Sequence, residues 1–587
     1  MPIEKRWVVK PQGDPATAAM LAAALRISPV LANLLVQRGI DTVEKAEKFF
    51  KPSLADLHDP FLMKDMEKAV ERVERAVANQ EKIMVYGDYD VDGCTAVALV
   101  YKFLRQIGHK NLMFYIPDRY TEGYGISIKG IDLAARKGVG LIIALDCGIK
   151  ATEKVVYAKT KGVDFIICDH HLPAEEIPKA VAVLDPKRVD CSYPFDELSG
   201  CGVGFKLVQA YAQKNRMPFE QILPLLDLLV VSIASDIVPL VGENRILAYF
   251  GLKNLNREPS KGLLSIIKIC GLDKHNITID DIVFKIGPRI NAAGRMEVDA
   301  EGENAAPSGG HSAVYLMVAR DEEVASEYGA FIDTCNQDRK NIDRSITQQA
   351  HELIERNPEM KARKSTVIYN PKWMKGIVGI VASRLIETYY RPTVVLTMSN
   401  GFVTGSARSV PGFDLYQAVE SCSDLLENFG GHMYAAGLTM RPERVEEFTR
   451  RFNAYVEENI DPQMLVPQVD VDAELLFSEI TPAFRRELKR FEPFGPGNAA
   501  PIFATRSVSN RGDAKLVGAE CEHLRMDLTQ RQKPNTTLQC IAFQQPEHFE
   551  WIRSGRPVDV CYQIVENHYR GTVSTQLRIK DIKRVEK

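Results

Sequence analysis

Acidic side chains and an adjacent pair of histidines follow several short apolar stretches of this 587-residue chain. The residues concerned are Asp88, Asp90, Asp92, Asp146, Asp169, His170, His171 and Asp236. Carboxylate oxygens are the preferred ligands of Mg²⁺, and Mn²⁺ also accepts imidazole nitrogen. These residue types therefore predict a site for hard divalent metal ions.

The apolar stretches indicate how these side chains come together. Stretches at 82–87, 141–145, 165–168 and 228–234 are short and are expected to be buried parallel strands. The carboxyl ends of such strands line one crevice of an open α/β sheet, so residues distant in sequence would meet there. Asp146, alone after its stretch, is the expected bridge between two metal ions, because their mutual repulsion needs a carboxylate between them.

Each aspartate taken alone has a simpler interpretation. An Asp after a strand commonly caps the next helix or belongs to a turn, and Asp92 before Gly93 fits such a cap. In an extended loop Asp88, Asp90 and Asp92 would point the same way, whereas a tight turn would splay them. Four stretches that all end in Asp, together with the histidine pair, favour the metal site.

Length and composition limit the class of protein. A chain of 587 residues predicts three or four domains, and its net charge of −3 argues neither for nor against nucleic-acid binding, since positive surface can be local. Eleven cysteines without a Cys-x-x-Cys pair fit neither a disulfide framework nor a zinc ribbon. No apolar run reaches the roughly 18 residues that span a bilayer, and 16–36 predicts an amphipathic helix, so we expect a cytoplasmic protein.

Alternating elements predict an α/β fold for the first half. The expected strands are 82–87, 111–116, 141–145, 164–168 and 180–184, and the expected helices are 93–108 and 151–161. This alternation predicts a doubly wound parallel sheet, preceded by a small helical segment. The glycine-rich stretch 200–204 suits either phosphate binding or a tight turn onto a helix.

Further elements follow in the second half. Residues 321–356 contain one glycine and no proline, and they predict a helix of roughly 50 Å that can connect domains. A second, smaller α/β unit is expected from strands 366–369, 393–397 and 401–407 and from helices near 376–389, 415–428 and 444–458. Strands at 538–543, 558–564 and 571–579 predict a small C-terminal β-barrel.

A second group of residues suits the binding of a phosphate. Its members are Ser406, Arg408, Ser409, Gly430, Gly431 and His432. An arginine near hydroxyls and a Gly-Gly backbone can recognise an oxyanion, because the glycines let backbone N–H groups approach closely. Alone, the glycine pair would be a helix C-cap and His432 a structural histidine.

The motifs, in chain order, resemble those of the DHH phosphoesterase superfamily. The four successive motifs are matched at 87–93, 146–148, 169–171 and 235–240. More narrowly, the chain resembles the family of RecJ exonucleases, since the segment 287–295 is similar to one typical of that family. The Gly-Gly-His at 430–432 with 435–437 resembles the hallmark of the DHH-associated second domain. Two departures concern contacts to the substrate end: Met374 stands where the family usually has His, and the loop 301–310 differs.

The expected elements and the resemblance together predict a division of the chain into five parts. These are a helical N-terminal segment (1–50), a DHH catalytic domain with a doubly wound parallel sheet (51–310), a connecting helix (311–360), a smaller α/β DHH-associated domain that binds phosphate or substrate (361–460), and an OB-fold barrel (461–587). The resemblance covers the chain from about residue 50 to the C-terminus.

The resemblance also implies a reaction and residue roles. Two Mn²⁺ or Mg²⁺ ions would hydrolyse single-stranded DNA from its 5′ end to mononucleotides, in DNA repair and recombination. The ions would activate the attacking water, so no separate general base is required. Asp90 and Asp146 would hold one ion, and Asp88 would be a ligand or a support. The other ion would be held by Asp92, Asp146, His170 and Asp236. The remaining implied site residues are Asp169, His171 and His432 for catalysis, and Arg289, Asn291, Arg295, Ser406, Arg408, Ser409, Gly430 and Gly431 for phosphate and DNA.

Single-stranded DNA is the implied partner, with a single-strand-binding protein and a helicase as further candidates for a monomer without membrane attachment. Side chains expected to hold the trailing strand are Tyr562, His568, Tyr569, Arg570, Arg485, Arg486, Lys489 and Arg490. Two other functions stay open: a DHH phosphodiesterase for short oligoribonucleotides or cyclic dinucleotides, and a non-catalytic DNA-binding scaffold. The C-terminal domain argues against the first, and the intact acidic set argues against the second.

Overall fold

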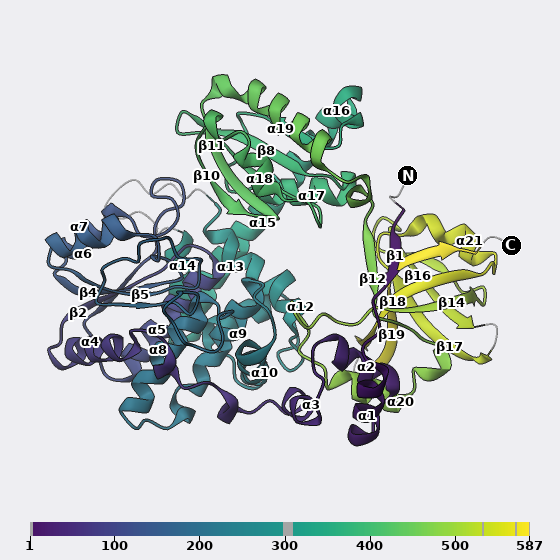
Figure 1. Ribbon diagram of the computed structural model, residues 1–587, viewed down its shortest axis with the longest axis horizontal. Helices are drawn as coiled ribbons and strands as arrows, with labels where there is room; N and C mark the ends of the chain where they lie inside the picture. The colour runs from purple at the N-terminus through teal and green to yellow at the C-terminus, as the bar shows by residue number, and fades with distance from the viewer. Residues whose placement is uncertain (1–3, 297–308, 531–532, 570–571, 586–587) are drawn as a thin grey trace. The chain divides into compact units, whose positions relative to one another are not determined.

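The computed structural model describes residues 4–296, 309–530, 533–569 and 572–585 (Figure 1). The chain forms two compact units. The first comprises 52–349 and 493–498, and the second comprises 1–51, 350–492 and 499–587. The loop expected to depart from the family pattern, 301–310, lies outside the described residues except for Gly309 and Gly310, which begin a helix.

A parallel sheet forms the centre of the first unit. Its strands, in spatial order, are β3 (Leu112–Tyr115), β2 (Lys82–Tyr86), β4 (Val139–Leu145), β5 (Asp164–Cys168) and β6 (Ala182–Leu184). Successive β4 residues contribute to different cores: Leu141 and Ile143 to one, Ile142 and Ala144 to the other. Burial on both faces explains why these strands are almost wholly apolar, and the predicted doubly wound sheet is confirmed.

Helices cover both faces of this sheet (Figure 1). One face carries α4 (Met66–Ala78), α5 (Val91–Gln106) and α8 (Gly200–Lys214), and the other carries α6 (Ile128–Arg136) and α7 (Thr152–Thr160). The glycine-rich stretch 200–204 is the first turn of α8 itself, whereas the sequence indicated a turn leading onto a helix. Helix α6 was not predicted.

The strand predicted at 228–234 is wrong. These residues form α9 (Leu226–Ser235), and Asp236 is the C-cap of that helix. Every residue from Leu226 to Ala234 is buried, so the helix has no polar face that would reveal its period. A short, fully buried helix and a buried strand have the same apolar sequence pattern.

Further helices complete the first unit. They are α10 (Gly242–Arg257), α11 (Lys261–Ile269), α12 (Ile279–Asp281), the π-helical turn η5 (Ile282–Ile286), α13 (Gly287–Ala293), α14 (Gly309–Val318) and most of α15 (Glu322–Glu355). The π-helical turn ends two residues before Pro288, which has no N–H for an α-helical bond. The long helix predicted at 321–356 is confirmed by the 34 residues of α15, which continue into the second unit.

The second unit begins with a strand that the sequence did not indicate. Strand β1 (Arg6–Val9) pairs in parallel with β12 (Gln468–Val471). Three helices follow it, α1 (Pro15–Leu25), α2 (Pro29–Gln37) and α3 (Val43–Phe50). Phe49 and Phe50 of α3 make edge-to-face contacts with Phe491, so the N-terminal segment packs on residues near position 490.

A five-stranded mixed sheet forms another part of the second unit. Its strands, in spatial order, are β10 (Leu426–His432), β11 (Ala435–Met440), β9 (Phe402–Arg408), β8 (Thr393–Ser399) and β7 (Thr366–Tyr369), and its helices are α16 (Pro358–Ala362), α17 (Val378–Tyr389), α18 (Leu415–Glu420) and α19 (Val445–Asn459). The helix predicted at 415–428 is wrong beyond Glu420. Gly430 and Gly431 lie in β10, so the helix C-cap interpretation of this pair is also wrong.

A closed barrel follows. The strands of this sheet are β13 (Ala473–Glu474), β14 (Phe503–Asn510), β15 (Lys515–Val517), β16 (His523–Gln530), β17 (Lys533–Ala542), β18 (Val558–Tyr569) and β19 (Thr572–Arg584), and its helices are α20 (Pro482–Lys489) and α21 (Phe549–Arg553). Strand β14 pairs with both β18 and β16, which closes a five-stranded barrel of the OB type. Tyr562 is fully buried and its hydroxyl contacts Thr505, so its predicted contact with a trailing strand is wrong. Arg570 and the side chains of His568 and Tyr569 lie outside the described residues.

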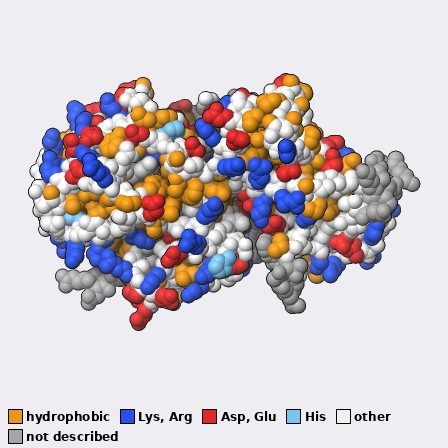
Figure 2. All heavy atoms as spheres, turned by 90° about the horizontal axis from the view of Figure 1, so that it is seen from below, with side chains coloured by type: hydrophobic (Ala, Val, Ile, Leu, Met, Phe, Trp, Pro, Cys, Tyr) orange, Lys and Arg blue, Asp and Glu red, His pale blue; other side chains and the backbone are white. Residues whose placement is uncertain are grey.

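The surface carries charges of both signs. On the face drawn in Figure 2, lysine and arginine side chains are interspersed with acidic ones, in keeping with the net charge of −3. Among the described residues, no helix is both long enough and apolar enough to cross a membrane.

A buried ion pair anchors α8 in the first unit. Lys206 Nζ lies 2.5 Å from Glu243 Oε1, and their side chains are 0% and 1% exposed. Glu243 also accepts hydrogen bonds from the Tyr193 hydroxyl and the His58 N–H. Burial lowers the pKa of Lys206, and the charge of Glu243 opposes that shift.

We expect Glu243→Gln to lower the stability of the first unit by about 3–5 kcal/mol, because it leaves a buried ammonium without its counter-charge. The measurement is urea unfolding followed by hydrogen exchange of the α8 amides. Glu176→Gln, which breaks the exposed pair with Lys179, is the control and should cost less than about 1 kcal/mol. Equal losses in the two variants would contradict the anchoring role.

Candidate metal centre

The loops after three neighbouring strands meet at the carboxyl edge of the parallel sheet. Asp88 and Asp90 follow β2, Asp146 follows β4, and Asp169 and His170 follow β5. The chain runs from β2 to β3 on one side of β2 and returns to β4 on the other. This edge is therefore a topological switch point, where open α/β sheets form their binding crevice.

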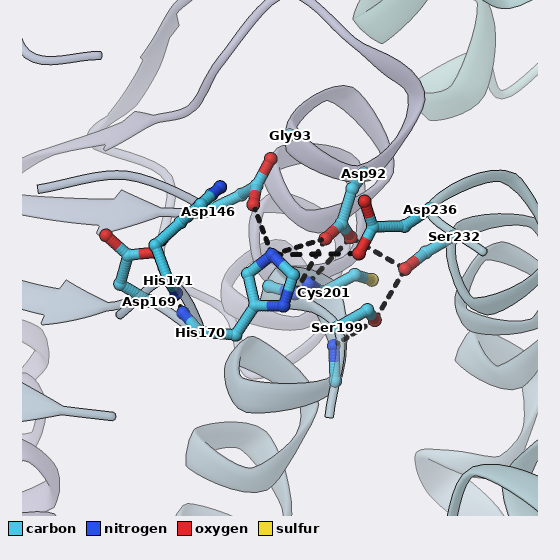
Figure 3. A network of polar contacts seen from close by, with 12 residues as sticks. Asp92, Gly93, Asp146, Asp169, His170, His171, Ser199, Cys201, Ser232 and Asp236 are labelled. Carbon is cyan, nitrogen blue, oxygen red and sulfur yellow. Dashed lines mark hydrogen bonds and ion pairs between the residues drawn. The ribbon is translucent and has the colours of Figure 1, made fainter. Parts of the chain in front are cut away.

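His170 lies at the centre of a cluster of carboxylates (Figure 3). Its Nε2 atom is 3.2 Å from Asp146 Oδ1, 3.8 Å from Asp92 Oδ2 and 3.6 Å from Asp236 Oδ2. Two overlapping sets, Asp92–His170–Asp236 and Asp146–His170–His171, each have their ligand atoms within 4.8 Å of one another. The fold therefore brings together residues that were predicted from the sequence as metal ligands. Asp236, however, comes from the end of helix α9 and not from the end of a strand.

The backbone of Asp146 adopts a conformation that is uncommon for residues other than glycine. Its φ angle is 57°, in the left-handed region that aspartate tolerates better than most residues. A Cβ atom on Gly200 would lie 2.5 Å from Asp146 Cβ. The close approach of α8 to this aspartate therefore requires glycine at position 200.

Asp92 is held by the first turn of α8. Its Oδ2 accepts a hydrogen bond from the Gly200 N–H at 2.6 Å, and its Oδ1 accepts one from the Cys201 N–H at 2.9 Å. The stretch that was predicted to bind phosphate or to form a turn onto a helix thus begins the helix itself, and its first amides bind a protein carboxylate. In the sequence, the glycines are the one indication of this contact between α8 and Asp92.

The three aspartates after β2 make different contacts. Asp90, and not Asp92, is the N-cap of α5 and accepts a hydrogen bond from the Gly93 N–H at 2.9 Å. Asp88 Oδ1 accepts a longer bond, 3.4 Å, from the Gly125 N–H. Asp88 and Asp90 belong to neither of the two ligand sets found among the described residues.

Electrostatics show that the cluster needs positive charge. Burial raises the pKa of Asp146 well above its usual range, and the charges of Asp92, Asp90 and Asp236 raise it further. Burial, with the charges of Asp92 and Asp90, raises the pKa of Asp236 to about 9. Carboxylates crowded in a buried site ionise together only when cations offset their repulsion.

An unpartnered carboxylate oxygen agrees with this requirement. Within the described residues, Asp88 Oδ2 is buried and has no hydrogen-bond partner. Burial and the charge of Asp90 raise the pKa of Asp88 well above its usual range. A set of carboxylate oxygens with one or two imidazoles suits Mg²⁺ or Mn²⁺, so the residues present fit divalent metal ions.

Asp169 contacts both residues of the histidine pair and belongs to neither ligand set found among the described residues. Its Oδ1 lies 2.7 Å from His171 Nδ1, and its Oδ2 accepts a hydrogen bond from the Ile149 N–H at 2.9 Å. Burial alone would raise the pKa of Asp169, but the hydrogen bond and charge of His171 lower it to about 2. Burial opposes protonation of His171, yet the same contact with Asp169 leaves its pKa raised.

Sequence reasoning missed Tyr124. Its hydroxyl donates to the Asp146 carbonyl at 2.9 Å and lies 3.2 Å from His171 Nε2. The loop that carries it is held by Glu122, whose carboxylate accepts hydrogen bonds from Tyr115 and Ser127. A tyrosine in a polar loop gives no sequence signal of such a contact, because the loop conformation decides it.

The residues of the second unit that were predicted to bind phosphate lie in rows across the mixed sheet. Arg408, Ala435 and His432 are in register on β9, β11 and β10, and directly opposed residues of antiparallel strands share a face. Arg408 Nη1 donates to Ser406 Oγ at 2.8 Å, and a Cβ atom on Gly379, the second residue of α17, would lie 3.0 Å from that oxygen.

Gly437 and Gly430 occupy the row of Ser406, so this face is open beside the arginine. Burial lowers the pKa of Arg408. The Ser409 hydroxyl is bonded to the carbonyls of Val410 and Phe413, so it is not part of this group.

The remaining predicted residues lie on or after α13 in the first unit. Arg289 Nε donates to Asp333 Oδ1 at 2.9 Å, and Asn291 lies on the same helix. The Arg295 carbonyl accepts a hydrogen bond from the Tyr120 hydroxyl. A Cβ atom on Gly294 would lie 2.6 Å from the Tyr89 carbonyl, so this segment packs against the loop of acidic residues.

Comparisons with known proteins agree along the chain. Three family models match: "DHH family, N-terminal domain" at residues 82–233, "DHHA1 domain" at 364–458 and "RecJ OB domain" at 471–581. The single-stranded-DNA-specific exonuclease RecJ of Bacillus subtilis is 36% identical over 98% of this chain and 70% of its own length. The RecJ of Salmonella typhimurium is 31% identical over 95% of this chain and 96% of its own.

Two solved structures of RecJ match this chain over nearly its whole length. The crystal structure of RecJ from Thermus thermophilus in complex with Mn²⁺ matches with a TM-score of 0.81 and 26% identity, over 99% of this chain and 80% of that one. The Mg²⁺ complex of the Thermus thermophilus protein matches with a TM-score of 0.75 and 25% identity, over 99% and 79% of the two chains.

Gly200→Ala tests the approach of α8 to Asp146. We expect Mn²⁺ affinity to fall by about ten-fold or more, because the new methyl group displaces Asp146 or the amides that hold Asp92. Isothermal titration with Mn²⁺ measures this. Gly202→Ala is the control on the same turn, since its nearest atom, Leu198 Cβ, is 3.3 Å away. Wild-type affinity in Gly200→Ala would contradict the required contact.

Proposed function

Since the chain belongs to the RecJ family of single-stranded-DNA-specific exonucleases, we propose that the cluster around His170 is its hydrolytic centre. The protein is a metal-dependent single-stranded-DNA-specific exonuclease that uses Mn²⁺ or Mg²⁺. One observation carries the assignment of the site: three carboxylates from three different elements lie 3.2–3.8 Å from one imidazole nitrogen.

We assign the ligands by combining this geometry with the family motifs. Asp90 and Asp146 hold one metal ion, with Asp88 as a further ligand or support. Asp92, Asp146, His170 and Asp236 hold the other. Two such ions, when bound, act as Lewis acids on the phosphodiester and supply an activated water.

The other side chains near the sheet edge orient groups and handle charge. Asp169 fixes the ring of His171, and its negative charge favours the protonated imidazole. A protonated His171 can donate a hydrogen bond to a phosphate oxygen as negative charge develops there. In the first unit we assign two cationic side chains to the binding of substrate phosphates: protonated His171 and Arg289 on α13.

Arg408, Ser406 and His432 provide a phosphate-binding face in the second unit. Their shared face, with Gly430 and Gly437 beside them, leaves room for an oxyanion next to a guanidinium. The two groups of residues belong to different compact units, so their joint action on one substrate stays a prediction.

The barrel supports the choice of a long single strand as substrate, because OB folds bind single strands by base stacking and backbone charge. Arg485 contacts Thr575, Lys489 pairs with Glu566, and Arg490 stacks on Phe50, whereas Arg486 is exposed. Arg486 is thus the clearest of the predicted cationic contacts on α20. Digestion from the 5′ end to mononucleotides, action as a monomer in the cytoplasm, and cooperation with a single-strand-binding protein and a helicase complete the proposal.

One assay tests the function. Purified protein with Mn²⁺ is incubated with 5′-labelled and 3′-labelled single-stranded DNA, short RNA and a cyclic dinucleotide. We expect the 5′ label to appear at once as a mononucleotide, while the 3′-labelled strand shortens progressively. Faster hydrolysis of the RNA or of the cyclic dinucleotide would favour the alternative phosphodiesterase, and no hydrolysis at all would favour a binding scaffold.

Asp146→Ala should lower turnover by several orders of magnitude, because it removes the ligand shared by both metal ions, while DNA affinity stays largely intact. Single-turnover cleavage and fluorescence anisotropy measure the two quantities. Asp132→Asn, which alters only a hydrogen bond from Tyr157, is the control in the same unit. Retention of more than about a tenth of wild-type turnover in Asp146→Ala would contradict the bridging role.

Arg408→Gln should weaken single-strand binding and lower the slope of log K against log salt by about one, because one phosphate contact is lost. Arg441→Gln removes an exposed arginine that pairs with Glu427 on the same sheet, and it is the matched control. Equal salt slopes for Arg408→Gln and wild type would show that Arg408 does not contact phosphate.

A further inference from the structure

A chain of hydrogen bonds leads through two buried serines to the carboxylate of Asp92 (Figure 3). The Gly202 N–H donates to Ser199 Oγ at 3.1 Å, and the hydroxyls of Ser199 and Ser232 are 2.7 Å apart. Ser232 Oγ donates to Asp92 Oδ1 at 2.6 Å. Both serines are fully buried, so water does not replace these bonds.

The direction of each bond follows from the number of protons. An ionised carboxylate has none to give, so the single hydroxyl proton of Ser232 goes to Asp92. Ser199 must therefore donate its own proton to Ser232, and it accepts the Gly202 N–H in turn. Bonds that all run in one direction polarise one another, which strengthens the last donor in the series.

This arrangement leaves the two oxygens of Asp92 in different situations. Oδ1 accepts from both Ser232 and the Cys201 N–H, and these two bonds use its lone pairs. Among the residues that the structure describes, Oδ2 accepts only from the Gly200 N–H, and it is the oxygen that lies 3.8 Å from His170 Nε2. Only Oδ2 has a lone pair available toward the centre of the cluster.

Ser232 and Asp236 are one helical turn apart. Residues four apart lie on the same face of a helix, and α9 presents this face to the cluster. Asp236 Oδ2 reaches to 3.6 Å from His170 Nε2, while Ser232 holds the carboxylate of Asp92. One helix thus supplies one carboxylate of the cluster and orients another.

We propose that Ser232 is a positioning residue that fixes the orientation of Asp92 and so sets the affinity of the centre for its metal ion. The inference rests on the proposed metal centre and adds to it a residue outside the family motifs quoted above. Ser199 and the first turn of α8 complete the chain. Groups that orient a metal ligand typically change metal affinity about 10–100-fold when removed.

Ser232→Ala tests the proposal without DNA. Free Mn²⁺ is measured by electron paramagnetic resonance during titration of the full chain, and we expect the dissociation constant to rise about ten-fold or more. In cleavage assays the Mn²⁺ concentration for half-maximal rate should rise by the same factor, while the rate at saturating Mn²⁺ recovers. A merely structural defect would lower the saturated rate and leave the half-maximal concentration unchanged.

Ser260→Ala is the control in the same unit. Its hydroxyl oxygen is buried and, within the described residues, has no hydrogen-bond partner, so the same substitution should leave Mn²⁺ affinity unchanged. Ser199→Ala keeps the bond from Ser232 to Asp92 and should give an intermediate loss. The order of affinities then reports on the chain even when Ser232→Ala itself fails to fold.

Asp92→Asn separates this inference from the proposed centre. Wild-type Mn²⁺ affinity in Asp92→Asn would overturn the ligand assignment. A large loss in Asp92→Asn with wild-type affinity in Ser232→Ala would overturn the role of Ser232 alone. If Ser232 acts through Asp92, the double variant should bind no more weakly than Asp92→Asn, whereas additive losses would refute the coupling.

Discussion

Mutual repulsion among buried carboxylates governs the architecture around the metal centre. Asp92, Asp146 and Asp236 approach a single imidazole, and burial makes each negative charge costly. The parallel sheet makes the approach possible, since the ends of its strands converge at one edge. The unmet negative charge is the feature that makes this edge a metal centre.

Helix α8 provides the local compensation. Its first amides bind Asp92, and the partial positive charge of a helix N-terminus favours a carboxylate there. This requires the helix to approach Asp146 so closely that position 200 has no room for a side chain. The buried pair of Lys206 and Glu243 then anchors the same helix further along.

The two compact units divide the chemistry. The first supplies oxygen and nitrogen ligands from a parallel sheet, and the second supplies cations and small residues on a mixed sheet together with a barrel. Strand ends and the helices α5, α8 and α9 organise the first group, whereas the register of β9, β10 and β11 organises the second. The long helix α15 continues from one unit into the other, which links the two functions within one chain.

Residue types and local patterns were enough to predict the chemistry and most of the elements. Carboxylates and histidines after buried strands predict a metal edge because their residue types and the strand period are both local properties. Packing alone decided that Asp236 ends a helix, because a fully buried helix has no visible period, and that Gly430 lies in a strand. It also decided the roles of Tyr124, Ser199 and Ser232. A hydroxyl takes its function from the neighbours that packing brings to it, and no pattern along the chain records those neighbours.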